Sequence, residues 1–239
     1  MPGPAGSLGP VSGIGVLREG PLHAALKDYY ARPGDRAEVP FGRFVIDLVR
    51  ADGELVEIQT GGFSPLGPKL DALLDHHRMR IVHPVAAERR ILRVDDAGEL
   101  LSARRSPRRA GALELFDRLV SFPSLLAHPN LAIEVPLCRE DHVRAPGPTR
   151  SRSGRRTRDP GERRLSEVLD TVVLEGPADV AALIPSGLDE PFTTRELGAA
   201  LGCRILLAQR VAYCMRALGV LADAGKRGRA PLHVRTQRS

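Results

Sequence analysis

The sequence predicts a mixed α/β domain followed by a smaller, mainly helical domain, and three observations lead to this prediction. Residues 44–60 read as two apolar strands around an Asp-Gly turn, which is the pattern of a β-hairpin. Apolar residues at helical spacing precede and follow this hairpin, and they dominate the C-terminal third of the chain. Between the two parts, residues 144–164 are rich in Arg, Gly, Ser and Pro without apolar periodicity, as expected of a linker or flexible arm.

The other elements of the first domain follow from spacing and from turn residues. Residues 1–16 contain many Gly and Pro and only small apolar residues, so we expect a disordered leader. Pro21 is favourable in the first turn of a helix, which we place over 21–31. The later elements of this domain, over 17–143, are expected in chain order as a helix over 66–77, a buried strand over 80–85, a second hairpin turning at 96–98, a helix near 112–121 and a strand near 131–137.

The first hairpin carries polar side chains where a core strand is normally apolar. Side chains alternate along a strand, so Glu57 and Gln59 share one side of the second strand. A two-residue turn at Asp52-Gly53 would put Asp47 and Glu57 on opposite faces. A three-residue turn, with Gly53 in the left-handed conformation, would set Asp47 directly opposite Glu57. We predict the three-residue turn and hence one polar cluster, which requires a partner or a metal if it is buried.

Asp47 on one strand and Glu57-Ile58-Gln59 on the next resemble the PD-(D/E)xK, or restriction-endonuclease-like, nuclease superfamily. The resemblance covers roughly residues 17–95 and implies an αβββαβ core. It also implies that Asp47, Glu57 and the main-chain carbonyl of Ile58 hold Mg²⁺ or Mn²⁺. The chain departs from the pattern at two positions: Ile46 stands where Pro is common, and Gln59 stands at the usual lysine position. Gln59 would then orient water or substrate.

Two further residues are candidates for the same site. The resemblance implies a metal-binding glutamate on the first helix, and Glu19 matches that position best; the alternative is a carboxylate that only favours the positive end of the helix. Lys69 lies on the second helix, in a chain with three lysines. A compact ammonium near the scissile phosphate is what Gln59 cannot supply, so Lys69 is our candidate, against the alternative of a solvated side chain. His76 and His77 are adjacent and cannot form a two-ligand clamp on a helix.

The second domain is predicted over residues 165–236. Helical spacing over 165–174 and 178–184 is followed by Thr193 and Glu196, which form a capping box before a short helix ending at Gly202. A longer helix is expected over 204–218, and then a basic hairpin.

This order resembles a winged helix-turn-helix domain, in which the second helix enters the major groove of DNA and the hairpin contacts its backbone. Domains of this kind also bind proteins, which stays an alternative. The residues that the resemblance assigns to nucleic acid are Gln209, Arg210, Tyr213 and Arg216 on the helix and Lys226, Arg227 and Arg229 in the hairpin.

The composition limits the class of protein. The hydrophobic content of 42% is enough for packed cores in one or two domains. The net charge is +6, and residues 144–164 account for all of it with eight arginines against two carboxylates. Arg152, Arg155 and Arg156 in this segment are candidates for phosphate contacts, against a merely solubilising linker.

Three cysteines without metal or disulfide spacing suit a reducing cytosol, so we expect a cytoplasmic protein. The sequence has neither an apolar run long enough for a membrane span nor a secretory signal pattern.

The sequence therefore predicts a Mg²⁺- or Mn²⁺-dependent nuclease that cleaves double-stranded DNA and is targeted by a C-terminal winged helix. A homodimer would suit duplex cleavage by this fold. One alternative is a catalytically inactive nuclease fold that serves as a DNA-binding or regulatory protein. Another is an interaction protein whose basic segments only confer solubility.

Overall fold

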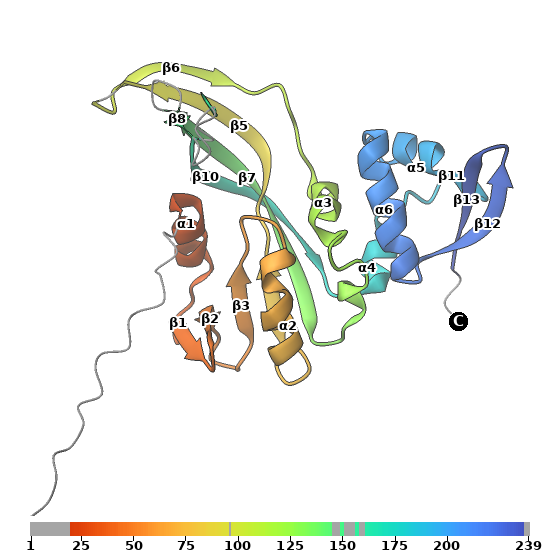
Figure 1. Ribbon diagram of the computed structural model, residues 1–239, viewed down its shortest axis with the longest axis horizontal. Coiled ribbons are helices and arrows are strands. Elements are labelled where there is room, and N and C mark those ends of the chain that lie inside the picture. The colour runs from red at the N-terminus through yellow and green to blue at the C-terminus, as the bar shows by residue number, and fades with distance from the viewer. Residues whose placement is uncertain (1–19, 96, 145–148, 151–155, 158–160, 237–239) are drawn as a thin grey trace, which may run out of the picture.

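The computed structural model describes residues 20–95, 97–144, 149–150, 156–157 and 161–236. One large mixed sheet dominates it, and its strands β5, β6, β7 and β10 form a long curved ribbon (Figure 1). The strands of this sheet are β1 Arg36–Phe41, β2 Phe44–Val49, β3 Leu55–Ile58, β4 Met79–Val82, β5 Val85–Val94, β6 Leu100–Arg105, β7 Leu131–Arg144 and β10 Glu162–Leu174. The chain order α1 (Pro21–Tyr30), β1, β2, β3, α2 (Gly67–Leu73), β4 gives an αβββαβ succession at the N-terminal end.

The sheet combines antiparallel and parallel pairs. Strands β1, β2 and β3 form an antiparallel meander, and β3, β4 and β7 then run parallel. Farther along the chain, β5 is parallel to β7 and antiparallel to β6, while β10 pairs antiparallel with β7. The expected strand over 80–85 is therefore two strands, because the His83-Pro84 step interrupts the ladder between β4 and β5.

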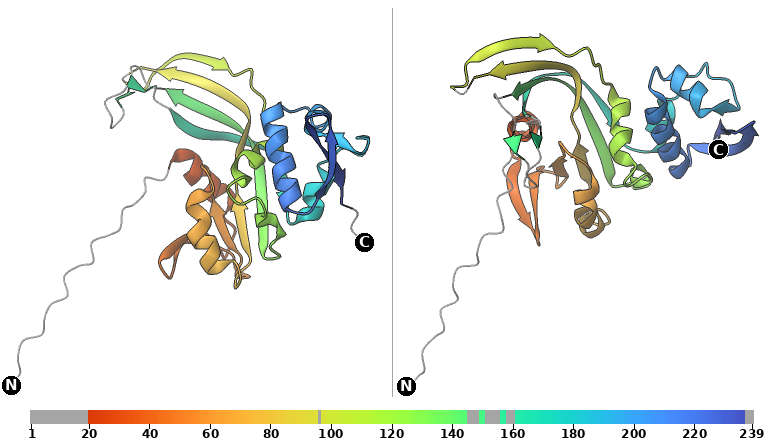
Figure 2. Two further views of the ribbon diagram at one scale, coloured as in Figure 1. Left: turned by 45° about the vertical axis from the view of Figure 1, so that its right-hand side comes forward. Right: turned by 45° about the horizontal axis from the view of Figure 1, so that its top comes forward.

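Helices cover both faces of the sheet. On one face α1 packs its buried residues Leu22, Leu26 and Tyr30 against the strands around Val56 and Cys138. The other face is covered by α2, by the short helices η1 (Ser64–Leu66), η2 (Ala112–Leu115) and η3 (Leu125–Ala127), and by α3 (Phe116–Leu119). Figure 2 shows α1 on the opposite side of the sheet from α3.

The C-terminal unit contains α4 (Pro177–Ala182), α5 (Thr194–Ala200), α6 (Ile205–Ala217) and a three-stranded sheet of order β11-β13-β12. Its strands are β11 Phe192–Thr193, β12 Leu221–Arg227 and β13 Ala230–Arg235. The predicted capping box is confirmed: the Thr193 side chain accepts a hydrogen bond from Glu196 N at 3.2 Å, and Thr193 N donates to Glu196 Oε2 at 2.7 Å.

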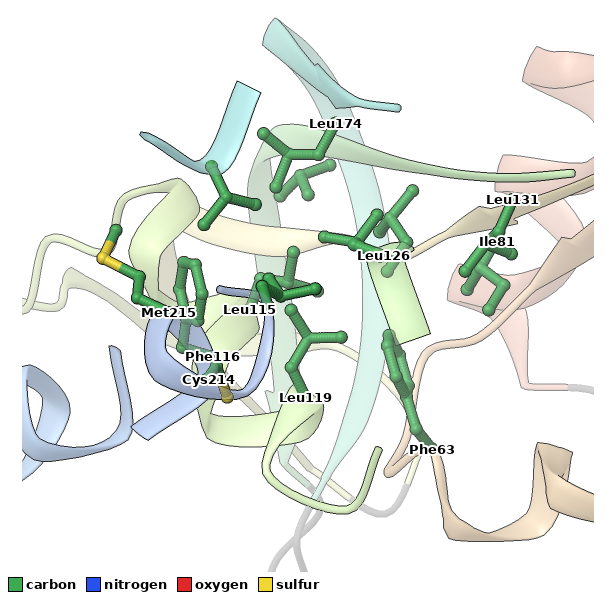
Figure 3. Packing of buried hydrophobic residues seen from close by; sticks show 14 of the residues in the cluster. Phe63, Ile81, Leu115, Phe116, Leu119, Leu126, Leu131, Leu174, Cys214 and Met215 are labelled. Carbon is green, nitrogen blue, oxygen red and sulfur yellow. The ribbon is translucent and has the colours of Figure 1, made fainter. Parts of the chain in front are cut away.

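The C-terminal unit shares a core with the large sheet. Phe116 and Leu119 of α3 belong to the same buried cluster as Cys214 and Met215 of α6 (Figure 3). Asp117 of α3 adds ion pairs to the basic side of α6. The two parts are therefore joined by apolar packing as well as by the chain.

The boundary between the two parts differs from the prediction. Residues 165–174 are not a helix but most of β10, which pairs with β7 along its length. The large sheet therefore continues past residue 143 to Leu174. Within the predicted linker, the structure contains the end of β7, the two-residue strands β8 (Thr149–Arg150) and β9 (Arg156–Thr157), and the start of β10. The predicted leader, residues 1–16, lies outside the described residues.

No helix in the described parts of the chain combines the length and apolar character that crossing a membrane requires.

The turn of the first hairpin should be sensitive to replacement of Gly53, whose φ is +88°. We expect Gly53→Ala to lower the free energy of unfolding by about 1 kcal/mol, because an L side chain is disfavoured in this conformation. A Cβ at position 53 meets no atom within 4 Å, so the effect is conformational and not steric. Urea denaturation measures it. Gly62→Ala is the matched control, because its Cβ is also free of contacts and its φ is not positive. Equal stability of the two variants would contradict the argument.

Candidate active site

The β2–β3 hairpin has the predicted three-residue turn. Arg50 N donates to Glu54 O at 2.9 Å, which leaves residues 51–53 as the loop. The pairs Leu48–Val56 and Val49–Leu55 set a register in which Asp47 stands opposite Glu57. The ladder ends at Leu48–Val56, and beyond it the Asp47 carboxylate accepts a hydrogen bond from Ile58 N at 2.7 Å. Asp47 thus replaces the main-chain acceptor that a continued ladder would have provided.

Glu57 lies next to Asp47 and is almost fully buried, with its side chain 10% exposed. Burial and the negative charge of Asp47 raise the pKa of Glu57 from 4.5 to about 6, although Lys69 opposes the rise. Lys69 Nζ donates to Glu57 Oε1 at 2.5 Å and to the main-chain oxygen of Val45 at 2.8 Å. The structure therefore brings Asp47, Glu57 and Lys69 together from β2, β3 and α2.

Sequence reasoning missed the histidine of this cluster. His23 of α1 places Nε2 at 3.2 Å from Asp47 Oδ1, so the cluster draws on both layers of helices. Lys27, one turn later, pairs with Glu38 at 2.6 Å, and Glu38 has a φ of +50°. Two basic residues at i and i+4 on the helix before an acidic hairpin were the signal that could have identified His23.

Gln59 does not join the cluster as expected. Its side-chain nitrogen donates to Gly62 O at 2.5 Å, and within the described residues no hydrogen bond links it to Asp47 or Glu57. Gln59 follows the last residue of β3, so strand alternation no longer fixes the direction of its side chain. Glu19 lies outside the described residues.

His77, His83 and Glu134 have structural partners outside the cluster, whereas His76 is exposed. His77 stacks edge-on against Phe41, and His83 Nδ1 lies 2.6 Å from the main-chain oxygen of Gln59. Burial lowers the pKa of His83 to about 4. Glu134 forms an ion pair with Arg80 at 3.0 Å.

The side chains of the cluster that could ligate a divalent cation meet its requirements only in part. In the part of the chain that the structure describes, no group of three or more His, Cys, Asp or Glu residues is arranged to hold a metal ion. Two carboxylates nevertheless face each other at this point, and the buried Glu57 Oε2 has no hydrogen-bond partner. Mg²⁺ commonly takes one or two carboxylates and fills its other positions with water and phosphate oxygens. Asp47 and Glu57 match that requirement.

Some of the candidates for nucleic-acid contact are already paired with groups of the protein. On α6, Gln209, Tyr213 and Arg216 share an exposed face, which forms a groove of about 340 Å³ with α5 and β13. Arg210 instead pairs with Asp117 of α3, so the helix-docking contact holds it away from that face.

The basic residues of the C-terminal hairpin and of the arginine-rich segment differ in the same way. Lys226 and Arg229 are exposed in the β12–β13 hairpin, whereas Arg227 donates to Glu196 at 2.6 Å and to Pro191 O at 3.0 Å. Arg156 begins β9, and Arg152 and Arg155 lie outside the described residues.

Comparison with known proteins places this chain in a protein family. Residues 20–175 match the model of a domain of unknown function, DUF8091. The chain belongs to the DUF8091 family. An uncharacterized protein of Treponema pallidum (strain Nichols) is similar to it, with 30% identity over 226 residues that cover 92% of this chain and 86% of the relative. No solved structure matches.

The extent of the family match agrees with the sheet. The DUF8091 region begins one residue before α1 and ends one residue after β10, so it contains the whole large sheet and the carboxylate cluster. The similarity to the Treponema protein covers nearly the whole chain and therefore extends into the C-terminal unit as well.

The raised pKa of Glu57 predicts a defined pH dependence of stability. Between about pH 4.5 and 6 the native state binds more protons than the unfolded state, so the contribution of Glu57 is greatest below this window and is lost as the pH rises through it. The free energy of unfolding of wild type minus that of Glu57→Gln should fall by about 2 kcal/mol from pH 4.5 to 7. Urea denaturation across this range tests it. Glu175→Gln, at an exposed position after β10, should leave the profile unchanged. A flat difference for Glu57→Gln would contradict the assignment.

Proposed function

We propose that this protein is a metal-dependent nuclease that hydrolyses phosphodiester bonds of DNA. The observation that carries the proposal is the convergence of Asp47 and Glu57, from facing positions of two strands, beside the Lys69 ammonium. The αβββαβ succession of α1 through β4 supports it, because this is the order that the resemblance to PD-(D/E)xK nucleases implies.

Asp47, Glu57 and the main-chain carbonyl of Ile58 would hold Mg²⁺ or Mn²⁺. When bound, the ion would lower the pKa of a coordinated water and offset negative charge on the reacting phosphate. Contacts within the protein hold the two carboxylates in position for this role. Ile58 N fixes one oxygen of Asp47 and His23 the other, while Lys69 holds Oε1 of Glu57 and leaves Oε2 free.

Lys69 would take the part that lysine has at the position of Gln59. Its ammonium lies between Glu57 and the Val45 carbonyl, on the α2 side of the cluster. A compact cation there stabilises the charge that develops on the phosphate oxygens in the transition state.

The C-terminal unit would bind the DNA. Its succession of α4, β11, α5, α6 and the β12–β13 hairpin supports the resemblance to a winged helix. Gln209, Tyr213 and Arg216 would face the major groove, and Lys226 and Arg229 would contact phosphates. Arg210 is left out because it pairs with Asp117. A homodimer would let two such sites act on both strands of a duplex.

A second candidate function is a catalytically inactive nuclease fold that binds DNA as a regulatory protein. Two observations favour it: Gln59 stands at the usual lysine position, and Lys69 is already hydrogen-bonded to Glu57 and to a main-chain oxygen. In that case the buried acidic pair and its lysine would only stabilise the fold.

Cleavage separates these two functions. With Mg²⁺ or Mn²⁺ we expect the wild-type protein to cleave plasmid DNA, and we expect Asp47→Asn, Glu57→Gln and Lys69→Met each to reduce the rate about 100-fold or more. Asp71→Asn is the control, because Asp71 is exposed on α2 two residues after Lys69. A wild type without activity would favour the regulatory function. Equal activity in all variants would mean a contaminating nuclease and would reject the proposal.

Duplex binding tests the C-terminal surface. Lys226→Gln and Arg229→Gln should each weaken binding of duplex DNA and reduce the slope of log K against log salt by about 0.9, since each removes one phosphate contact. Fluorescence anisotropy across a salt series measures both quantities. Arg210→Gln is the matched comparison: it should lower the stability to urea, through the loss of its pair with Asp117, and leave the salt slope unchanged. The reverse result would contradict the assignment.

A further inference from the structure

The large sheet has an opening along one edge. Pairing of β3 with β4 ends at Val82, whose main-chain oxygen accepts a hydrogen bond from Gln59 N at 2.8 Å. Pairing of β5 with β6 begins at Arg89, whose main-chain oxygen accepts a hydrogen bond from Ser106 N at 2.8 Å. Between these points, residues 83–88 have no partner strand on this edge among the described residues. A cavity of about 320 Å³ lies at the opening, between β5, the segment leading into α3, and the start of α6.

Some of the arginines that line the cavity form no ion pair with a carboxylate in the described part of the protein. Of the cavity's five arginines, three have carboxylate partners: Arg163 with Glu140, Arg108 with Glu114, and Arg204 with Asp117. The remaining two are Arg89 and Arg118, and no ion pair engages either of them among the residues that the structure describes.

Arg89 has an unused donor at this cavity. Its Nε is buried and has no hydrogen-bond partner among the described residues, as is also true of Arg144 Nε, so an acceptor in the cavity would satisfy it. Burial lowers the pKa of Arg89; the charge of Glu140 opposes this, and the neighbouring Arg163 and Arg108 add to the lowering. A bound anion would supply both the acceptor and the negative charge.

Arginines also outnumber carboxylates on the other face of these strands, where Arg105 and Arg109 line a second cavity and form no ion pair among the described residues. Neighbouring arginines on that face of β5 and β7 are matched, with Arg90 paired to Asp141 at 2.6 Å and Arg139 paired to Glu88 at 2.9 Å.

One arginine of the cavity is fixed by a buried carboxylate. Arg163 donates to Glu140 through Nε at 2.9 Å and through Nη2 at 2.8 Å. Burial alone would raise the pKa of Glu140, but the hydrogen bonds from His142 and Arg163 outweigh it and hold this pKa at about 2. Arg163 is thus a positioning residue, while Arg89 and Arg118 keep guanidinium groups available for a ligand. The planar guanidinium fork matches the oxygens of a phosphate.

The cavity begins where the strand carrying Glu57 ends. Arg163 Nη1 donates to the main-chain oxygen of Thr60 at 3.2 Å, and His83 contacts that of Gln59 at 2.6 Å. Three residues of extended chain span at most about 10 Å, so the lining lies close to the carboxylate cluster.

We propose that this cavity binds a phosphate of the same nucleic-acid strand whose scissile phosphate lies at Asp47 and Glu57. The inference rests on the proposed function, because it takes the ligand to be the nuclease substrate. Arg89 and Arg118 contact the phosphate oxygens, and the strand passes over the Gln59-Thr60 segment between the two sites.

Binding without cleavage tests the proposal. In EDTA, the affinity of the full chain for a fluorescein-labelled single-stranded oligonucleotide is measured by anisotropy across a salt series. Arg89→Gln and Arg118→Gln should each weaken binding at least about tenfold at low salt and reduce the slope of log K against log salt by about 0.7, the value for one phosphate contact on a single strand. Arg78→Gln removes the same charge from an exposed position between α2 and β4 and should bind as wild type does.

The outcomes are distinct from those for the nuclease activity. If both cavity variants bind as Arg78→Gln does, or if all three lose affinity equally, the cavity is not a phosphate site. Failure of the wild type to bind at low salt also overturns the proposal. If wild type does not cleave but the two cavity variants lose binding selectively, the phosphate site stands and the nuclease function fails. Urea denaturation of each variant shows that a loss of affinity is not a loss of fold.

Discussion

The register of one hairpin decides whether the carboxylates of Asp47 and Glu57 meet on one face of the sheet. Three loop residues, with Gly53 in the left-handed conformation, put Asp47 opposite Glu57. One residue fewer would turn one carboxylate to the other face of the sheet. The buried Glu57 and the partly buried Asp47 repel each other, so the arrangement needs compensation, and Ile58 N and Lys69 provide it. The surrounding elements hold these groups in place: α1 brings His23 from one face, and α2 brings Lys69 from the other.

Local patterns predicted the parts of the fold that depend on local interactions. The hairpin turn, the capping box at Thr193 and the long helix α6 follow from turn chemistry, side-chain capping and apolar spacing, and the structure contains all three. The segment 165–174 was predicted wrongly as a helix. Its apolar residues fit helical spacing, but eight of its residues pair with β7 and make it a strand, and sequence spacing does not reveal a partner distant in the chain.

The candidate site divides in the same way. Strand alternation and turn length were sufficient to bring Asp47 and Glu57 together, and the scarcity of lysine pointed to Lys69. Strand alternation did not predict the position of the Gln59 side chain, because β3 ends one residue earlier. The side chain instead donates a hydrogen bond to Gly62 O in the following loop. His23 reaches Asp47 from α1 across the sheet, a contact that only the packing of helix on sheet determines.

The docking of α6 against α3 has a consequence for how this protein can be divided. The family match ends at residue 175, which suggests a natural point at which to separate the large sheet from the C-terminal unit. A polypeptide ending there would leave Phe116 and Leu119 without Cys214 and Met215, exposing apolar surface to water, and Asp117 without its arginines. Such a fragment would tend to self-associate. The excised sheet would therefore be a poor stand-in for the intact chain in any assay of its chemistry.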